Sequence, residues 1–440
     1  MLTHAQNEML TQTGPGTPMG ALFRRFWTPI LLSRELPEPD CPPVRVKILG
    51  EDLLAFRDSA GVVGLIEPRC PHRGANLFFG RNEEGGIRCV FHGWKFDVHG
   101  KCLEIPTMPR DAATYAHLCA RAAIKAYTTR EWGDCVWAYL GPTESVPPLP
   151  EMEFALIDPS HRYVAKKLQE CNWAQSVEGA IDTAHFSFLH TRVGAAAANA
   201  PPSSYDDQNR WMQADPSPRY TVLPHDAGLI LAGARHADPG ETYWRIAQFL
   251  MPNHSYAPVG APGQTSHGQT WVPIDDTSCW VFTYSWNAAR PLGEAERGAY
   301  ERGGAIHSEV DSDYVPLRRR ANDYMIDRAA QREGSFTGIT GIAEQDAAIQ
   351  DSQGFIHDRT REMLGPTDLG ISQFRVLMLS AAQELMAGTA APAAANNAAA
   401  YRVRSGMIVT PDGLPFDEVM MRRFGDLAGR FDHDDTVAAE

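Results

Sequence analysis

Two short segments, each holding one cysteine and one histidine, constrain this chain more than any other feature. Cys70 and His72 are separated by one residue, Cys89 and His92 by two, and residues 73–88 lie between the pairs. Thiolates and neutral imidazoles are metal ligands, and two of each complete either a tetrahedral zinc site or a two-iron cluster. The spacing therefore predicts a metal centre between two loops and leaves the type of metal open.

The residues around these four ligands favour an iron–sulfur cluster over zinc. Segments 70–75 (CPHRGA) and 89–96 (CVFHGWKF) resemble the two cluster-binding loops of Rieske proteins, those of ring-hydroxylating oxygenases especially. The resemblance implies a [2Fe-2S] centre in which the two cysteines hold one iron and the two histidines hold the other. Gly74 and Gly93 suit such loops, because glycine allows a positive φ and a close approach of the backbone to the cluster.

A second group of possible metal ligands lies further along the chain. Asp182, His185 and His190 have spacings of three and five, which places their side chains near one another at the end of a helix. Two imidazoles and one carboxylate on one face of Fe(II) leave positions open for dioxygen beside a substrate. On this reasoning Asp182 could be the third ligand, and histidines at a helix end without any metal are the simpler alternative.

The resemblance to Rieske oxygenases gives Asp182 a different role. In that family the matching acid bridges a metal-bound histidine to a Rieske histidine of the neighbouring subunit, so Asp182 would be the catalytic electron-transfer bridge. The third iron ligand then comes from a later helix. Segment 341–346 (GIAEQD) resembles that helix, and Asp346 matches the ligand position. Glu344 is the nearest rival, and a solvated helix acid is the plain alternative.

The remaining sequence predicts two domains of an α+β protein. Strand-like runs between Gly and Asp turns predict a strand-rich domain at 25–143, after an N-terminal segment at 1–24. Closely spaced prolines predict a linker at 144–160. A catalytic domain at 161–385 would hold an antiparallel sheet with long helices, and 386–440 would be a linker and C-terminal extension. The resemblance implies an all-β Rieske domain followed by a helix-grip domain.

Composition limits the partners of the chain. The 40 basic and 54 acidic side chains give a formal net charge of −14, which disfavours nucleic acid and anionic membranes as partners. No apolar run approaches the length of a membrane span, and the first residues lack an export pattern, so a soluble cytoplasmic protein is expected. An Ala-rich tract at 194–202 is expected to be a surface loop or a lid.

Two further segments narrow the resemblance. Residues 171–190 and 353–368 are similar to the phthalate 4,5-dioxygenase group. This similarity implies the oxygenase component of a multicomponent enzyme for aromatic catabolism, with a Rieske cluster and a mononuclear Fe(II). Such an enzyme cis-dihydroxylates phthalate at positions 4 and 5 with O2. It takes electrons from NADH through a flavin/[2Fe-2S] reductase, and it forms a homo-oligomer, a head-to-tail trimer or two stacked trimers.

Two other functions remain open at this point. One is a Rieske oxygenase for another aryl carboxylate, such as a halobenzoate or phenoxybenzoate dioxygenase or an aryl O-demethylase. The other is a Rieske electron carrier or ligand-binding module without mononuclear iron. The number of iron atoms that each chain binds separates an oxygenase from a carrier.

Binding of an aromatic dicarboxylate by an acidic protein requires a local group of cations. Arginine meets a buried carboxylate best, because its guanidinium pairs with both oxygens. The candidates are Arg245, Arg210 and Arg235, with Arg219 as a further one. In segment 243–249 the alternation of a strand places Arg245 on an otherwise apolar face, which is unusual unless an anion meets it there. The alternative for each is a pairing with an acid of the protein.

Overall fold

The computed structural model describes residues 1–194, 206–258 and 263–432, and they form two compact units. The smaller unit, here the Rieske unit, comprises Gly14–Gly16 and Phe23–Pro147. The larger unit, called the catalytic unit here after the domain expected from the sequence, comprises Met1–Thr13, Thr17–Leu22 and the described residues from Pro148 onward. The boundary at Pro147 lies inside the expected linker at 144–160. The tract expected as a loop or lid, 194–202, lies outside the described residues except for Gly194.

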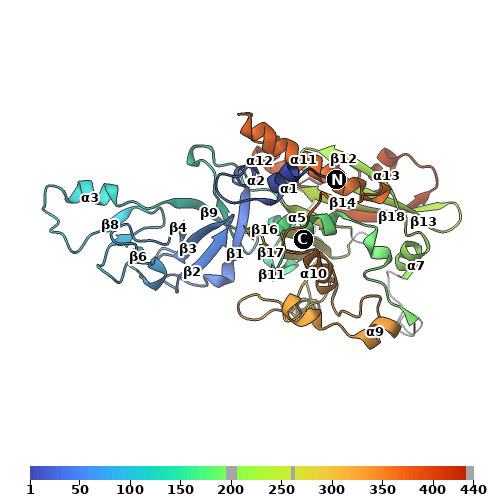
Figure 1. Ribbon diagram of the computed structural model, residues 1–440, viewed down its shortest axis with the longest axis horizontal. Helices are drawn as coiled ribbons and strands as arrows, with labels where there is room; N and C mark the ends of the chain where they lie inside the picture. The colour runs from blue at the N-terminus through green and yellow to red at the C-terminus, as the bar shows by residue number, and fades with distance from the viewer. Residues whose placement is uncertain (195–205, 259–262, 433–440) are drawn as a thin grey trace. The chain divides into compact units, whose positions relative to one another are not determined.

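The Rieske unit is built from two antiparallel sheets (Figure 1). The six-stranded sheet has the order β1-β10-β9-β4-β3-β2, and the four-stranded sheet has the order β5-β6-β7-β8. One helix, α3 (Tyr115–Arg121), follows the second sheet. The strands are β1 (Trp27–Leu32), β2 (Val44–Ile48), β3 (Glu51–Arg57), β4 (Val63–Ile66), β5 (Arg81–Glu83), β6 (Gly86–Arg88), β7 (Lys95–Phe96), β8 (Cys102–Glu104), β9 (Ala126–Trp132) and β10 (Cys135–Tyr139).

The core of the Rieske unit explains where its two metal-binding loops lie. Phe56 of β3, Ile87 of β6 and Phe96 of β7 are fully buried in one apolar cluster. Cys70 and Cys89 belong to the same cluster, so both thiols face the inside of the unit. The strands therefore form the rigid support from which the two loops project.

The catalytic unit contains an eight-stranded antiparallel sheet of order β11-β17-β16-β15-β14-β13-β12, with β18 also paired to β14. Helices surround this sheet (Figure 1), so the mixed α+β fold expected from the sequence is confirmed. The strands are β11 (Arg162–Gln169), β12 (Arg219–His225), β13 (Gly228–His236), β14 (Glu241–Leu250), β15 (His254–Ala257), β16 (Ser266–Asp275), β17 (Ser278–Trp286) and β18 (Gly406–Pro411). The helices are α1 (His4–Thr11), α4 (Glu153–Leu156), α5 (Trp173–Ile181), α7 (Asp206–Ala214), α8 (Glu294–Glu301), α9 (Arg328–Glu333), α10 (Ile342–Ser352), α11 (Leu369–Met386), α12 (Ala393–Asn396) and α13 (Phe416–Phe424), while α2 (Pro18–Phe23) runs into the boundary with the Rieske unit.

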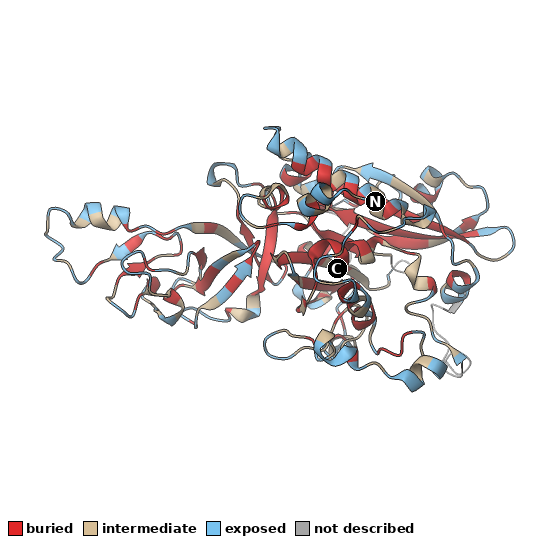
Figure 2. Cartoon of the chain, viewed as in Figure 1, coloured by how far each residue is buried: buried red, intermediate tan, exposed pale blue. Residues whose placement is uncertain are grey.

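Aromatic packing fixes α5 and α11 on the sheet. Phe374 of α11 is fully buried and meets Trp173 of α5 edge to face at a ring distance of 6.0 Å. The same ring meets Phe249 of β14 at 4.9 Å. Edge-to-face pairs of this kind contribute about 0.5–1.5 kcal/mol each beyond the burial of their area. Figure 2 shows that burial is concentrated in the central sheet and the inner faces of such helices.

The C-terminal residues differ from the linker and extension expected at 386–440. Strand β18 pairs with β14 from Gly406 to Pro411. Helix α13 then packs Val419 and Met420 against the buried side chains of β13 and β14. The described part of this segment therefore completes the catalytic unit, and 433–440 lie outside the described residues.

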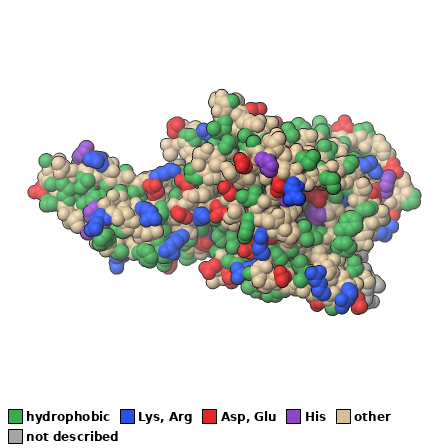
Figure 3. Space-filling view, in the orientation of Figure 1, with side chains coloured by type: hydrophobic (Ala, Val, Ile, Leu, Met, Phe, Trp, Pro, Cys, Tyr) green, Lys and Arg blue, Asp and Glu red, His purple; other side chains and the backbone are tan. Residues whose placement is uncertain are grey.

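The distribution of charged side chains on the surface is as expected for an acidic protein. On the face that Figure 3 shows, Lys and Arg side chains are scattered among acidic and apolar ones and form no broad basic area. None of the helices in the described ranges is both long enough and apolar enough to cross a lipid bilayer.

Candidate metal centres and catalytic site

The two loops of the Rieske unit have the same backbone geometry. The N–H of Cys70 donates to the carbonyl of Ala75, and the N–H of Gly74 donates back to the carbonyl of Cys70. The second loop repeats both bonds between Cys89 and the two residues Gly93 and Trp94. Both glycines have the positive φ expected of them, 73° and 76°. Each cysteine is thus held at the start of a tight turn that presents the histidine of its own loop.

The four side chains fit a [2Fe-2S] cluster. Cys70 and Cys89 are 2% and 3% exposed, and burial raises the pKa of the Cys70 thiol to about 11. The rings of His72 and His92 lie 4.5 Å apart. Nδ1 of His92 is buried and has no hydrogen-bond partner among the described residues. A buried nitrogen without a partner beside two buried thiols is what a bound iron would satisfy.

The second group of ligands converges in the catalytic unit. The Nε2 atoms of His185 and His190 lie 3.2 Å apart, and Oδ1 of Asp346 lies 3.3 Å from Nε2 of His190 and 3.7 Å from Nε2 of His185. All three ligand atoms lie within 4.8 Å of one another. Atoms bound about 2.0–2.2 Å from one metal must be this close together, and two imidazoles with one carboxylate are the facial triad of non-haem iron enzymes.

Asp182 lies beside this triad and contacts its outer side. Helix α5 ends at Ile181, and a single turn at His185–Ser187 follows. Oδ2 of Asp182 lies 3.2 Å from Nδ1 of His185, the nitrogen that faces away from the triad. Burial opposes ionisation of Asp182, but hydrogen bonds from the ring and backbone of His185 and from the Ala184 N–H outweigh it and hold the carboxyl pKa below its usual value. The structure thus favours Asp346 over Asp182 as the third ligand.

Glu344, the rival of Asp346, does not join the triad. Its side chain is buried beside a separate small cavity that Lys167 and Ser308 also line, and its Oε2 has no hydrogen-bond partner within the described part of the chain. Two contacts of the site were not expected from the sequence. Gln345 meets Nδ1 of His190, and the hydroxyl of Tyr220 lies 3.4 Å from Asp182. The position of Gln345 next to Asp346 was the one signal that could have found it.

Two of the candidate arginines are buried on adjacent strands. Arg245 of β14 is 5% exposed and Arg235 of β13 is fully buried. Nε of Arg245 donates to Oγ1 of Thr183 at 3.1 Å, and its Nη1 lies near the sulfurs of Met212 and Met407. Within the described ranges, neither arginine forms an ion pair with an acid. Two buried cations without an acidic partner are costly unless an anion binds there.

The two buried arginines differ in how their guanidinium N–H groups are used. Nε of Arg235 donates to the carbonyl of Asp215, and its Nη2 donates to the carbonyl of Thr183 at 2.6 Å. Burial and the nearby charge of Arg245 lower the pKa of Arg235 to about 10. Arg245 instead covers the ring of Phe186 at 4.1 Å, and this ring also contacts the rings of His185 and His190. Arg245 is therefore one aromatic ring away from the triad.

Arg210 lies in a different environment. It is on α7, its side chain is 57% exposed, and it pairs with Asp207 and Asp238, each at 3.1 Å. This is the pairing with protein acids that the sequence left as an alternative. A role of Arg210 in substrate binding stays a prediction that this geometry does not favour.

Comparison with known proteins decides the family. Residues 26–127 match the model of the Rieske [2Fe-2S] domain, and residues 138–421 match the model described as LigXa C-terminal domain like. The chain is a Rieske oxygenase. It is 36% identical over 434 residues to the phthalate 4,5-dioxygenase oxygenase subunit of Pseudomonas putida, covering 96% of this chain and 95% of that one. It is 37% identical over 431 residues to the 3-chlorobenzoate-3,4-dioxygenase oxygenase subunit of Comamonas testosteroni, covering 95% and 97%.

Solved structures agree with the fold. NdmB of Pseudomonas putida CBB5 matches with a TM-score of 0.57 at 19% identity, covering 85% of this chain and 96% of that one. The resemblance found in the sequence is thus confirmed. As a Rieske oxygenase, the protein is an oxidoreductase that uses a Rieske [2Fe-2S] cluster and a mononuclear iron.

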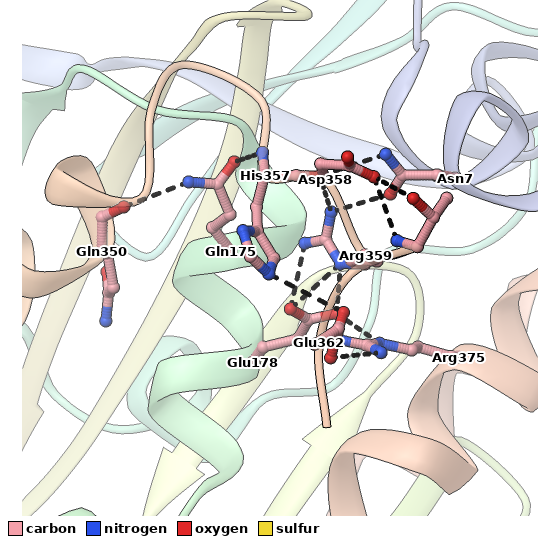
Figure 4. A network of polar contacts seen from close by, with 10 residues as sticks. Asn7, Gln175, Glu178, Gln350, His357, Asp358, Arg359, Glu362 and Arg375 are labelled. Atoms are coloured by element: carbon pink, nitrogen blue, oxygen red, sulfur yellow. Dashed lines mark hydrogen bonds and ion pairs between the residues drawn. The ribbon is translucent and has the colours of Figure 1, made fainter. Parts of the chain in front are cut away.

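A buried ionic network supports the helix that leads to Asp182 in this oxygenase (Figure 4). Glu178 of α5 accepts two hydrogen bonds from Arg359 at 2.9 Å and one from Arg375 at 2.7 Å. Arg375 also donates to Glu362 at 3.0 Å. Burial opposes ionisation of Glu178, but the two guanidinium groups outweigh it and keep the carboxyl pKa below its usual value. Removing one member of such a network typically costs about 3–5 kcal/mol.

A cavity of about 210 Å³ lies between this network and the iron site of the oxygenase. Asp182, His185 and Asp346 line one part of it, and Glu362 and Arg375 line another. The side of the triad that carries Asp182 is therefore accessible and polar. On the side of Phe186, Arg245 lies over this ring and near the sulfurs of Met212 and Met407.

Proposed function

We propose that this oxygenase adds both atoms of O2 to an aryl carboxylate, and that phthalate, attacked at positions 4 and 5, is its substrate. The observation that carries the proposal is Arg245, a buried guanidinium with no acidic partner among the described residues. The ring of Phe186 separates it from His185 and His190. A carboxylate on Arg245 would supply the missing charge and hold the attached ring near the iron site. The similarity to the phthalate 4,5-dioxygenase oxygenase subunit supports this choice of substrate.

Each of these side chains would have a separate role in the reaction. His185, His190 and Asp346 would hold the iron, which supplies the activation of dioxygen when bound. Arg245 binds the substrate carboxylate and orients the ring. Asp182 accepts a hydrogen bond from Nδ1–H of His185, which fixes the ring with Nε2 toward the triad. Arene, O2, two electrons and two protons balance to a cis-dihydrodiol, in which both oxygen atoms are retained.

We further propose how the electrons arrive. The Rieske cluster accepts them singly from a flavin/[2Fe-2S] reductase that oxidises NADH. They then pass to the iron site of the neighbouring subunit in a head-to-tail trimer. The protein forms either one such trimer or a hexamer of two stacked trimers. Asp182 would bridge His185 to His92 of that neighbour. The accessible cavity beside Asp182 supports this route, because it leaves the carboxylate open to a second partner. We place the enzyme in the cytoplasm, where NADH is present.

A halobenzoate is the second candidate substrate. The donors of Arg235 are used by Thr183 and Asp215, so Arg245 is the one buried candidate with donors to spare. One guanidinium suits one carboxylate, and the similarity to the 3-chlorobenzoate enzyme points the same way. A carrier without mononuclear iron is disfavoured, because the triad converges as a metal site.

The test is product analysis with the purified oxygenase, a phthalate dioxygenase-type reductase and NADH. Phthalate, 3-chlorobenzoate and benzoate are each incubated under ¹⁸O-labelled dioxygen, and products are identified by mass spectrometry. The proposal expects a dihydrodiol of phthalate with two labelled atoms and tight coupling of NADH use to product. A dihydrodiol from 3-chlorobenzoate alone would select the second candidate, and a product with a single labelled oxygen atom would contradict both.

A further inference from the structure

Gln345 connects the iron site to the loop that precedes α10. It lies directly before Asp346 and is 8% exposed. Its Oε1 lies 2.7 Å from Nδ1 of His190, and its Nε2 donates to the carbonyl of Ile339 at 2.8 Å. Both ends of the side-chain amide therefore have a buried partner.

The second of these contacts decides the direction of the first. A backbone carbonyl can only accept a hydrogen bond, so the NH2 group of Gln345 must face Ile339 and its oxygen must face His190. An amide oxygen can only accept, so Nδ1 of His190 must carry the proton. In a neutral imidazole the other nitrogen, Nε2, then has the free lone pair, and this nitrogen faces Asp346 and His185.

We propose that Gln345 is a positioning residue that fixes His190 in the one tautomer and ring orientation able to bind iron. The two histidines of the triad are then held by different groups. His185 is held by the carboxylate of Asp182, which also faces the accessible cavity, and His190 by a neutral amide that is anchored to the backbone. The proposal concerns only how the protein holds iron, so it does not depend on which substrate the enzyme uses.

The chain offers a matched control on the same helix. Gln350 is also 8% exposed and lies five residues after Gln345 on α10. Its Oε1 accepts from Gln169 at 2.6 Å, so it too is a buried amide with a hydrogen-bond partner. No hydrogen bond joins Gln350 to any of the three expected ligands. Gln350 lines the same cavity as His185 and Asp346, so its substitution removes a buried amide near the triad without removing a hydrogen bond to any of the expected ligands.

The test compares Gln345→Met and Gln350→Met in the full-length protein with its cluster intact. The mononuclear site is emptied with a chelator, and its affinity for Fe(II) is measured anaerobically by competition. Partners of metal-bound histidines typically contribute about 10- to 100-fold in affinity. We expect a loss of this size in Gln345→Met and wild-type affinity in Gln350→Met. Equal affinity in Gln345→Met and wild type, or an equal loss in both variants, would overturn the proposal.

A third variant separates positioning from packing. Gln345→Glu keeps an oxygen that accepts from His190 but loses the donor to Ile339. We expect its thermal midpoint to fall while its Fe(II) affinity stays near wild type, and the d–d absorption of the Co(II)-loaded site to keep its wild-type shape. In Gln345→Met that spectrum should change. If affinity follows stability through all three variants, Gln345 acts on packing alone and the proposal fails.

Discussion

The two metal sites of this oxygenase are built in opposite ways. The expected Rieske ligands come from two loops that repeat the same pair of backbone hydrogen bonds, and all four lie within residues 70–92. The expected iron triad combines residues that follow α5 with a residue of α10, so that His190 and Asp346 are 156 positions apart in the sequence. Its histidines contact the side chains of Asp182 and Gln345. A site fixed by the backbone is visible in sequence spacing, whereas a site fixed by side chains depends on the packing of distant elements.

The largest expected effect tests whether the two sites are independent. Asp346→Ala should reduce iron from about three atoms per chain to about two and abolish product formation, because two histidines alone bind Fe(II) weakly. The visible spectrum of the cluster should remain. Iron analysis and absorption spectra check this. Cys70→Ala is the reciprocal variant, which should lose the cluster while the triad still binds Co(II). Loss of both centres in either variant would contradict the independence of the two units.

The next effect concerns transfer between the sites. Asp182→Asn should keep most mononuclear iron and a normal cluster spectrum, because Asp182 contacts the outer nitrogen of His185 and not the converging ligand atoms. An amide has one acceptor oxygen where the carboxylate has two, so it cannot hold imidazole N–H groups on both sides. We expect oxidation of the reduced cluster in a single turnover to slow by about 100-fold. Rapid oxidation would end the bridging role.

Loss of iron in the same variant would have another meaning. If Asp182→Asn empties the mononuclear site and Asp346→Asn behaves like wild type, the roles given to these two acids are exchanged. The pair of variants therefore tests which carboxylate binds the metal and which one carries the contact between sites.

Substrate charge gives a smaller effect. Arg245→Met should raise KM for phthalate by about 1.5–3 kcal/mol in free-energy terms, the value of a lost charged hydrogen bond. The iron content should not change. Arg210→Met is the control, because Arg210 is exposed and already paired with Asp207 and Asp238. Steady-state kinetics check both variants. A larger loss in Arg210→Met than in Arg245→Met would move the carboxylate site to α7.

The contrast between a site fixed by its backbone and a site fixed by side chains also explains which features could be predicted from the sequence. The loops around Cys70 and Cys89 were predictable because their geometry is local, and the position of Asp346 came from family resemblance. The partner of His190 was not predictable, since an amide beside a ligand has no distinctive spacing. Strand β18 was missed for a related reason. Its residues follow an Ala-rich stretch that is typical of a linker, and its pairing with β14 joins residues 160 to 170 positions apart.

The last effect concerns the stability of the catalytic unit, which contains three buried histidines with lowered pKa values. Burial lowers the pKa of His267 to about 4 and that of His254 to about 3, and it also lowers the pKa of His307. Their unfolded value is about 6.5. Because the folded value is lower, the unfolded chain binds protons first, so stability is fully present above pH 6.5 and is lost as the pH falls toward 4.

His267→Gln isolates one of these contributions. Nδ1 of His267 lies 2.8 Å from Oγ of Ser285, a contact that a glutamine amide can replace. The fall in pKa of His267 corresponds to about 3 kcal/mol of stability lost between pH 6.5 and 4. Between pH 6.5 and 4, the free energy of unfolding of His267→Gln should therefore fall by about 3 kcal/mol less than that of the wild type. Urea unfolding of the catalytic unit, followed by tryptophan fluorescence, measures this difference. The absorption of the Rieske cluster, followed in the same samples, reports on the other unit and should show no difference between variant and wild type. An unchanged pH dependence of unfolding in His267→Gln would mean that the pKa of this histidine is the same in the folded and the unfolded chain, which its buried position beside Ser285 opposes.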